Sequence, residues 1–269
     1  MVALNEYAPA ARFFDRLAPE YDSIFTFSVI GRAQRDIVWQ RALATFASGS
    51  HILELNCGTG EDALFLAKSG MRVTACDASA GMIQQASNRM ATERPNATIE
   101  FLVMATENLD ALPDNLRFQG VFSNFSGLNC VRDIRSVAQQ LAKRVEPGAS
   151  LLLCLSTRYC LWEIAYYMLR GNWRKAFRRC GGSTLARLGD LEFEVYYPTL
   201  VALRKAFVPW FHLRSVTGVG TAVPPSYLES WIAAHPRLLS MLDHIDAMVR
   251  EWPGVRVLGD HMLVNLERV

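Results

Sequence analysis

The stretch from His51 to Gly60, HILELNCGTG, decides the fold of this chain. Its first half is a short apolar run interrupted by one acid, Glu54, and predicts a buried β-strand. Its second half contains Gly58 and Gly60, and a helical pattern begins at Glu61. A backbone that turns this sharply needs residues without a Cβ, and glycine lets a ligand lie against the main chain. The stretch therefore predicts a strand, a ligand-binding turn and a helix.

The bulk composition predicts a soluble, single-core protein. The chain has 269 residues, of which 51% are hydrophobic and 20% charged, enough for one domain with an elaboration. A net charge of +2 indicates no nucleic-acid partner. The six cysteines form no CxxC pair, which is typical of a reducing, cytoplasmic compartment. No signal peptide is evident, and the longest apolar run, near 151–155, is too short to span a bilayer.

Strand and helix patterns alternate after residue 51. Helices are expected at 61–69, 79–92 and 131–145, and as a pair over 226–250 split near His235-Pro236. Strands are expected at 52–56, 72–76, 98–103, 120–124, 150–155, 212–217 and 261–267. We expect the very apolar strand at 150–155 to be central and the last strand to close an edge. Such alternation indicates a mostly parallel sheet covered by helices on both faces.

The predicted fold class is α/β, with a Rossmann-like seven-stranded sheet. Residues 1–50 are expected to form an N-terminal helical segment, broken near Pro19 and Gly31. Residues 51–157 and 211–269 would form the Rossmann-like domain. The aromatic-rich residues 158–210 would form a cap inserted after the fifth strand.

The glycine turn fits two cofactor classes, dinucleotides and S-adenosylmethionine. Gly58, Gly60 and Ala63 satisfy the dinucleotide fingerprint literally. However, Glu61 and Asp62 place two carboxylates on the first helical turn, where a pyrophosphate would be repelled. An acidic turn suits a sulfonium and an ammonium, so the pattern favours S-adenosylmethionine.

Two further acids agree with that cofactor. Glu54, at the end of the first strand, is placed to receive a ligand ammonium directly or through water. Asp77, at the end of the second strand, is placed to accept the hydroxyl groups of a ribose. The alternative for Asp77 is to cap the following helix, although Ser79 is equally placed to do so.

Successive motifs resemble those of class I S-adenosylmethionine-dependent methyltransferases, especially the small-molecule branch called type 11 or 25. The motifs are HILELNCGTG, VTACDASAGMI, MATENL, FQGVFSNFSGLNCV and LAKRVEPGASLLLCL, within residues 51–155. The opening FDRLAPEYD, within residues 13–22, is similar to the N-terminal segment of quinone-type methyltransferases. In these enzymes a tyrosine helps to close over the cofactor, and Tyr21 is in register with it. Tyr21 as an ordinary core aromatic is the equal alternative.

The resemblance implies a role for each matched residue. The methionine part of the cofactor would lie on Glu54, Asn56, Gly58 and Gly60, and the ribose on Asp77. The adenine would contact Ala78, Met82, Ala105, Thr106 and Glu107. The reacting methyl would be bordered by Asn124 and Phe125. The chain departs from the pattern at Asn56, where a glycine is usual, and at Ala105 and Gln119, where acids are common.

The chemistry requires no fixed catalytic residue, because the cofactor itself activates the methyl group. We therefore assign none. His261, beside Asp260, is the best-placed histidine for a general base, but each histidine is more often structural. The sequence contains no metal-ligand spacing and no GxSxG elbow, so neither metal chemistry nor serine hydrolysis is expected.

The predicted cap should supply specificity. Tyr159, Trp162 and Tyr166 are the expected acceptor-binding residues, the alternative being that they only pack the cap onto the sheet. A basic run follows, comprising Arg170, Arg174, Lys175, Arg178 and Arg179. It is compatible with an anionic substrate group or a peripheral membrane contact, and also with a solvated helix face.

We therefore expect an enzyme that transfers a methyl group from S-adenosylmethionine to a small-molecule acceptor, releasing S-adenosylhomocysteine. Lipid-like, quinone-like and secondary-metabolite acceptors all suit an aromatic cap. The alternatives are a non-catalytic protein that binds the same cofactor and an NAD(P)-dependent oxidoreductase. The sequence does not fix the accepting atom or the oligomeric state.

Overall fold

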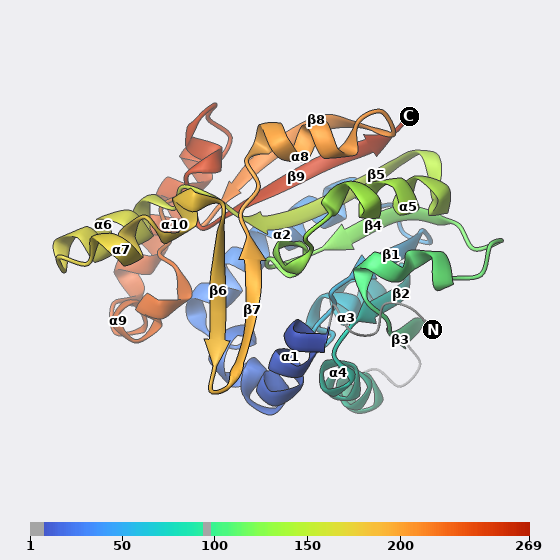
Figure 1. Ribbon diagram of the computed structural model, residues 1–269, viewed down its shortest axis with the longest axis horizontal. Coiled ribbons are helices and arrows are strands. Elements are labelled where there is room, and N and C mark those ends of the chain that lie inside the picture. Colours follow the sequence, from blue (N-terminus) through green and yellow to red (C-terminus); the bar gives the residue numbers. More distant parts are fainter. Residues whose placement is uncertain (1–7, 94–97) are drawn as a thin grey trace.

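A seven-stranded sheet forms the centre of the molecule (Figure 1). The computed structural model describes residues 8–93 and 98–269, so residues 1–7 of the predicted N-terminal segment lie outside the described part. The strands of the sheet are β1 His51–Leu55, β2 Arg72–Asp77, β3 Ile99–Val103, β4 Phe118–Ser123, β5 Val145–Ser156, β8 Phe211–Val219 and β9 His261–Arg268. Their order is β3-β2-β1-β4-β5-β9-β8.

The predicted fold class is confirmed, because β1 to β5 are parallel and β9 is the one strand of this sheet that runs in the opposite direction. The apolar strand predicted at 150–155 is interior, between β4 and β9. The prediction that the last strand closes an edge is wrong. β9 lies between β5 and β8, and its apolar residues are buried on both faces, so β8 forms the edge.

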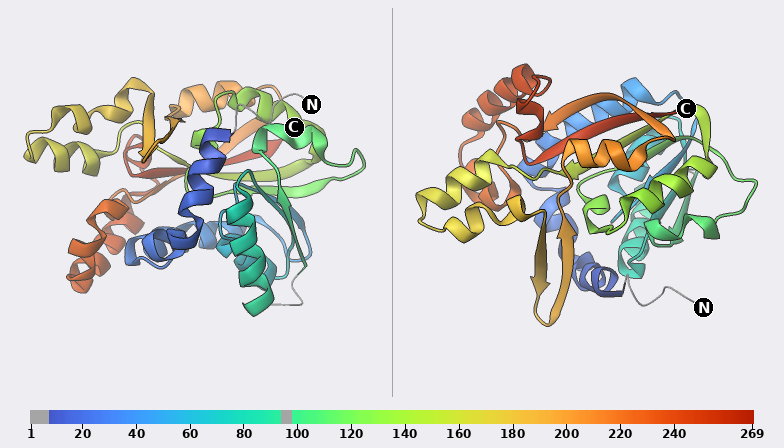
Figure 2. Two further views of the ribbon diagram at one scale, coloured as in Figure 1. Left: turned by 60° about the horizontal axis from the view of Figure 1, so that its bottom comes forward. Right: turned by 45° about the horizontal axis from the view of Figure 1, so that its top comes forward.

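Helices cover both faces of the sheet (Figure 2). The α-helices of the described chain are α1 Ala8–Tyr21, α2 Val29–Thr45, α3 Glu61–Lys68, α4 Ala80–Glu93, α5 Ile134–Arg144, α6 Leu161–Leu169, α7 Trp173–Ala176, α8 Leu200–Phe207, α9 Glu229–Ala233 and α10 Pro236–Val249, and not all of them lie on the sheet. The molecule has one hydrophobic core on each face of the sheet, and alternate residues of β5 pack into one or the other. Leu151 and Leu153 pack in the core that includes α5 and α8, whereas Leu152 packs in the core that includes α2 and α3. This period of two is the geometry of a strand buried on both sides.

The N-terminal helices break between the two predicted positions. Pro19 lies inside α1, and the break is a π-helical turn over Asp22–Thr26. Gly31 lies in the first turn of α2, where a Cβ would overlap the carbonyl oxygen of Phe25. The glycine therefore permits the close approach of the turn to α2 rather than ending a helix.

Residues 158–210 contain an element that the helical and aromatic patterns did not reveal. After α6, α7 and a 3-10 turn at Arg178–Gly181, the chain forms a β-hairpin, β6 Ser183–Leu188 with β7 Leu191–Tyr196. The hairpin extends beside α1 (Figure 1). The next helix, α8, contributes Leu203 and Phe207 to the core of the sheet. The division of the chain into three segments stays a prediction.

Gly60 offers a test of how the glycine turn is packed. Gly58 and Gly60 both have positive φ, of 53° and 76°. A Cβ at Gly60 would lie 2.8 Å from the Cβ of Ala86 in α4, whereas a Cβ at Gly58 would have no neighbour within 4 Å. We expect Gly58→Ala to lower the free energy of unfolding by about 1 kcal/mol through backbone strain. Gly60→Ala should cost a further ~1–3 kcal/mol through overpacking. Urea unfolding curves measure both, and equal losses would contradict this packing.

Candidate active site

A cavity of about 420 Å³ opens at the carboxyl ends of β1, β2 and β4. The strand order reverses between β1 and β4, which is where open α/β sheets bind ligands. The sequence-predicted residues that line the cavity come from α1 and from the segments after these strands and β3: Tyr21, Asn56, Gly58, Asp77, Ala78, Met82, Thr106, Glu107, Asn124 and Phe125. Glu54, Gly60 and Ala105 do not line it. The structure thus brings most of the predicted set together, while their individual roles stay predictions.

Asp77 fastens the glycine turn to the second strand. Its carboxylate accepts hydrogen bonds from the backbone N–H of Gly58 (3.0 Å) and of Ser79 (2.9 Å). The hydroxyl of Ser79 in turn accepts the N–H of Met82 and caps α4, so Asp77 is not needed for that role. Burial raises the pKa of Asp77 to about 6. Each carboxylate oxygen has a second lone pair for a ligand hydroxyl.

Asn56 occupies the position where the family pattern has glycine. Its φ is 54°, in the left-handed region that asparagine tolerates better than most residues. Its side-chain oxygen accepts a hydrogen bond from the Thr106 hydroxyl at 3.0 Å. A Cβ at Gly127 would overlap the Cβ of Asn56. The larger residue at 56 is therefore accommodated by the absence of a side chain at 127.

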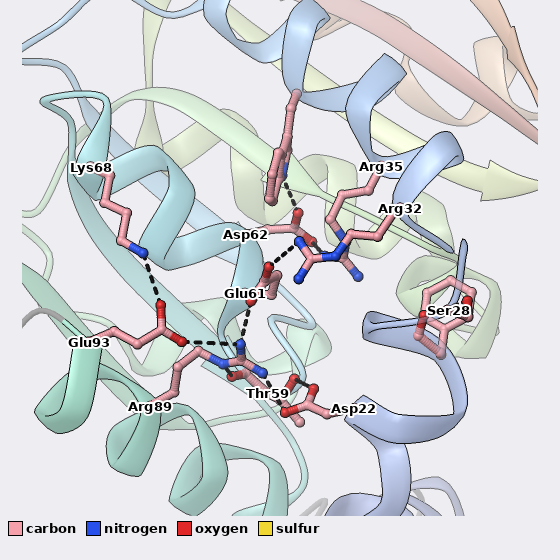
Figure 3. Close-up of polar contacts among 12 residues, drawn as sticks. Asp22, Ser28, Arg32, Arg35, Thr59, Glu61, Asp62, Lys68, Arg89 and Glu93 are labelled. Carbon is pink, nitrogen blue, oxygen red and sulfur yellow. Dashed lines mark hydrogen bonds and ion pairs between the residues drawn. The ribbon is translucent and has the colours of Figure 1, made fainter. Parts of the chain in front are cut away.

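Arginines neutralise the acids that follow the glycine turn (Figure 3). Glu61 forms ion pairs with Arg89 and, at 2.7 Å, with Arg32. Asp62 pairs with the buried Arg35 at 2.7 Å. The inference that Glu61 and Asp62 make the turn acidic toward a ligand is therefore wrong. Their partners lie on α2 and α4, far away in sequence, so the pairing has no local signal.

Asp62 also positions the loop after β4. It accepts hydrogen bonds from the indole N–H of Trp39 (2.6 Å) and the side-chain amide of Asn124 (3.2 Å). The next residue, Phe125, has a φ of 44°, and its ring lies 4.8 Å from the Arg35 guanidinium. Strained backbone of this kind persists where the surroundings hold it in place. The loop is thus fixed at the cavity by contacts to α2 and α3.

Glu54 lies beneath the turn as a buried acid with an unpaired oxygen. Its side chain is 1% exposed, and Oε2 has no hydrogen-bond partner in the described part of the chain. Burial, reinforced by the nearby Asp62, raises the pKa of Glu54 well above its usual range. A buried, unpaired carboxylate oxygen is costly unless a ligand or water supplies a donor. Because Glu54 does not line the cavity, a ligand ammonium would satisfy this oxygen through a water molecule.

The predicted acceptor-binding aromatics lie elsewhere. Tyr159, Trp162 and Tyr166 do not line the cavity. Trp162 donates its indole N–H to the carbonyl of Ala222 at 2.9 Å, and Tyr166 packs on Tyr227 with ring centroids 5.2 Å apart. α6 faces the small core beside α2 and α9, so its aromatic residues are used for packing there.

The β6–β7 hairpin and α1 supply the cavity wall that the sequence interpretation missed. Phe14, Phe193, Val195 and Tyr196 line it, and the Phe193 ring lies 5.8 Å from that of Phe14. The signal that could have revealed the hairpin is the alternation of apolar and polar residues on both sides of Gly189-Asp190, a two-residue loop typical of a hairpin.

Polar groups also lie on this wall, among them Glu194 and the hydroxyl of Tyr196. The Tyr196 hydroxyl donates to Glu194 at 2.7 Å, and burial followed by this bond raises the pKa of Tyr196. Hydrogen bonds from Ser183 and Tyr196 lower the pKa of Glu194. Arg132 also lines the cavity, and it is the only lysine or arginine among the described lining residues.

His261 does not reach the cavity. It is buried behind Phe125, with ring centroids 5.5 Å apart, and burial lowers its pKa. Within residues 8–93 and 98–269, no cluster of three or more potential metal ligands occurs. Nor does any helix in the described ranges have the length and apolar character needed to cross a membrane.

Comparison with known proteins agrees with this geometry. Residues 52–148 match the family model described as a methyltransferase domain. A demethylmenaquinone methyltransferase from Clavibacter sepedonicus is 32% identical over 145 residues, covering 52% of this chain and 55% of that protein. A tRNA 5-carboxymethoxyuridine methyltransferase from Escherichia coli K12 is 28% identical over 169 residues, covering 60% and 62%. The chain thus spans somewhat over half the length of these relatives.

Solved structures share the fold across nearly the whole chain. The structure titled DhpI-SAH complex aligns with a TM-score of 0.61 and 16% identity, covering 99% of this chain and 98% of the other. The predicted resemblance to class I methyltransferases is confirmed by these matches. The expected enzyme class and cofactor agree with them as well.

The contact between Asn56 and Gly127 can be tested with a double-mutant cycle. We expect Gly127→Ala to lower the free energy of unfolding by about 1–3 kcal/mol, because its methyl group would collide with Asn56. Asn56→Gly should remove the obstacle, so the double variant should recover most of the loss, measured by urea unfolding. Simple additivity of the two single changes would contradict this assignment.

Proposed function

We propose that this protein is an S-adenosylmethionine-dependent methyltransferase that acts on a small, largely apolar acceptor. One observation carries the proposal. On one side of the cavity lie the glycine turn and Asp77, an acid placed to bind a ribose, and on the other side lies an aromatic wall that includes Phe193. The methyltransferase-domain match over residues 52–148 supports the same activity.

The residues present fit the cofactor. Asp77 would hold the ribose hydroxyls, and Ala78, Met82 and Thr106 would line the adenine. Glu54 lines neither this cavity nor the smaller adjoining one, so its unpaired oxygen would receive the ammonium through a water molecule. Arg35, in the adjoining cavity, would attract the carboxylate. When bound, S-adenosylmethionine supplies an activated methyl group, so the protein's task is alignment and exclusion of water.

The acceptor half of the cavity favours an aromatic ring with an oxygen substituent. Apolar contacts come from Phe14, Phe193 and Val195. Polar contacts at the same wall come from Arg132, Glu194 and the Tyr196 hydroxyl. The Clavibacter relative is named for a quinone-type substrate and supports this class. The Escherichia coli relative is named for tRNA. A polyanion would need more cations than Arg132 alone among the described lining residues.

Methyl-label transfer tests the activity. The protein is incubated with methyl-labelled S-adenosylmethionine and a reduced naphthoquinone, or with unfractionated tRNA in a parallel reaction. We expect label in the naphthoquinone fraction, identified by mass. Phe193→Ala should raise the acceptor KM about tenfold by removing apolar contact area, whereas Tyr159→Ala, outside the cavity, should leave it unchanged.

Each other outcome has a definite meaning. Tight S-adenosylhomocysteine binding without transfer to any acceptor would support the non-catalytic alternative. Label in tRNA alone would refute the acceptor class. A raised KM in Tyr159→Ala but not in Phe193→Ala would return the acceptor site to the segment predicted from the sequence.

Glu54 makes cofactor binding depend on pH. Its raised pKa keeps this carboxyl protonated to a higher pH than usual, and a bound ammonium nearby would favour loss of that proton. We expect S-adenosylhomocysteine affinity to rise with pH up to the pKa of Glu54 in the free protein and then level off, with proton release on binding. Calorimetry in buffers of different ionisation enthalpy measures both.

Glu54→Gln provides the matched test of that prediction. It should weaken binding about tenfold, the effect of losing one charge-assisted hydrogen bond, and abolish its share of the proton release. Glu100→Gln, on the exposed side of β3, is the control and should change neither quantity. Wild-type affinity in Glu54→Gln would show that this acid does not contact the ligand.

A further inference from the structure

The two-helix projection formed by α6 and α7 ends in a continuous exposed stretch. In Figures 1 and 2 the pair extends away from the sheet at one end of the molecule. Every residue from 168 to 175 is exposed. We call residues 168–177 the tip; within it, only Ala176 is buried.

The tip exposes large apolar side chains together. Leu169 is 89% exposed, Trp173 58%, Phe177 44% and Met168 37%. Trp173 and Phe177 stack on each other with ring planes 12° apart. Single exposed apolar residues are ordinary on a protein surface, but a contiguous group on a projection marks a site of interaction.

The tip is also cationic. It contains Arg170, Arg174 and Lys175 and no acid, and none of the three forms an ion pair within the described residues. Arg170 lies over the Tyr166 ring at 3.8 Å, and Lys175 over the Tyr167 ring at 5.5 Å. These cations lie in the same ten-residue tip as the exposed apolar side chains, and none of them pairs with an acid of the described chain.

The neighbouring basic residues behave differently. Arg178 and Arg179 both pair with the buried Glu163, at 2.7 and 2.9 Å. They fasten the base of the projection and are not free to bind a partner. The basic run of the sequence thus has two parts. Arg178 and Arg179 stabilise the base of the projection, whereas the unpaired cations lie in the tip, together with the exposed apolar side chains.

We propose that the tip docks this protein on the surface of a membrane that contains anionic lipids. Leucine and tryptophan side chains would enter the boundary between headgroups and acyl chains, while the three cations would face the lipid phosphates. Stable attachment requires two such signals, apolar and electrostatic, and the tip carries both. This inference does not rest on the proposed methyl transfer.

A lipid surface fits the tip better than RNA does. RNA is bound by cations and by aromatic rings on which bases stack, and it gains little from an exposed leucine. Leu169 is the most exposed of the large apolar residues in the described chain, and its contribution comes only from leaving water. The same segment continues into the β6–β7 hairpin, whose Phe193 lines the cavity.

Vesicle flotation tests the docking. The full chain is mixed with vesicles of phosphatidylcholine alone or of equal parts phosphatidylcholine and phosphatidylglycerol. We expect binding to the anionic vesicles only, weakened at high salt because screening reduces the attraction. Arg174→Glu with Lys175→Glu should reduce binding at least about tenfold. Arg204→Glu with Lys205→Glu, the same charge change on exposed residues of α8, is the control and should not.

A second pair of variants tests the apolar part. Leu169→Gln with Trp173→Gln should also reduce vesicle binding at least about tenfold. Leu43→Gln with Trp252→Gln, which are 51% and 57% exposed elsewhere, is the matched control. Thermal unfolding confirms that each variant is folded, as expected from the exposure of all these side chains.

Three results would overturn the proposal. The first is no binding of the wild-type protein to anionic vesicles. The second is an equal loss of binding in a control pair, which would show that the effect is not specific to the tip. The third is that the wild-type protein shifts unfractionated tRNA in a gel but does not bind vesicles. In that case the charge-reversed tip should lose the shift, and Leu169→Gln with Trp173→Gln should keep it. That pattern would assign the tip to nucleic acid.

Discussion

The buried ion pair between Arg35 and Asp62 is the interaction on which the site depends. It joins α2 to the first turn of α3, directly after the glycine turn. Through Asp62 it also holds Asn124, and through Arg35 it lies against Phe125. A buried pair costs desolvation, and breaking one by removing a partner leaves an unpaired charge at a cost of about 3–5 kcal/mol. The N-terminal helices are therefore part of the cavity's structure.

A second constraint explains how the turn differs from the family pattern and still forms. Asn56 adopts a left-handed conformation, and its side chain occupies space that Gly127 leaves open. The two residues lie on different loops that meet only because β1 and β4 are neighbours in the sheet. A departure that looks unfavourable in one motif is thus compensated in another.

The segment between β5 and β8 contains two structures with different surroundings. Its first part, α6 and α7, packs aromatic residues inward and exposes Leu169 and Trp173 outward. Its second part, the β6–β7 hairpin, brings Phe193 to the cavity. The segment between β5 and β8 therefore links one wall of the cavity to an exposed apolar and cationic surface. Both proposals, an apolar acceptor and docking on a membrane, draw on this one segment.

The sequence by itself determined the alternating sheet and the glycine turn, and it singled out residues at several strand ends that line the cavity, because hydrophobic period and turn chemistry are local properties. Only the tertiary structure decided which side chains meet. Contacts between distant segments set the arginine partners of Glu61 and Asp62 and the interior position of β9. They also place Phe193, and not Tyr159, at the cavity. Neither composition nor spacing encodes such contacts, since packing selects the partners once the sheet order is fixed.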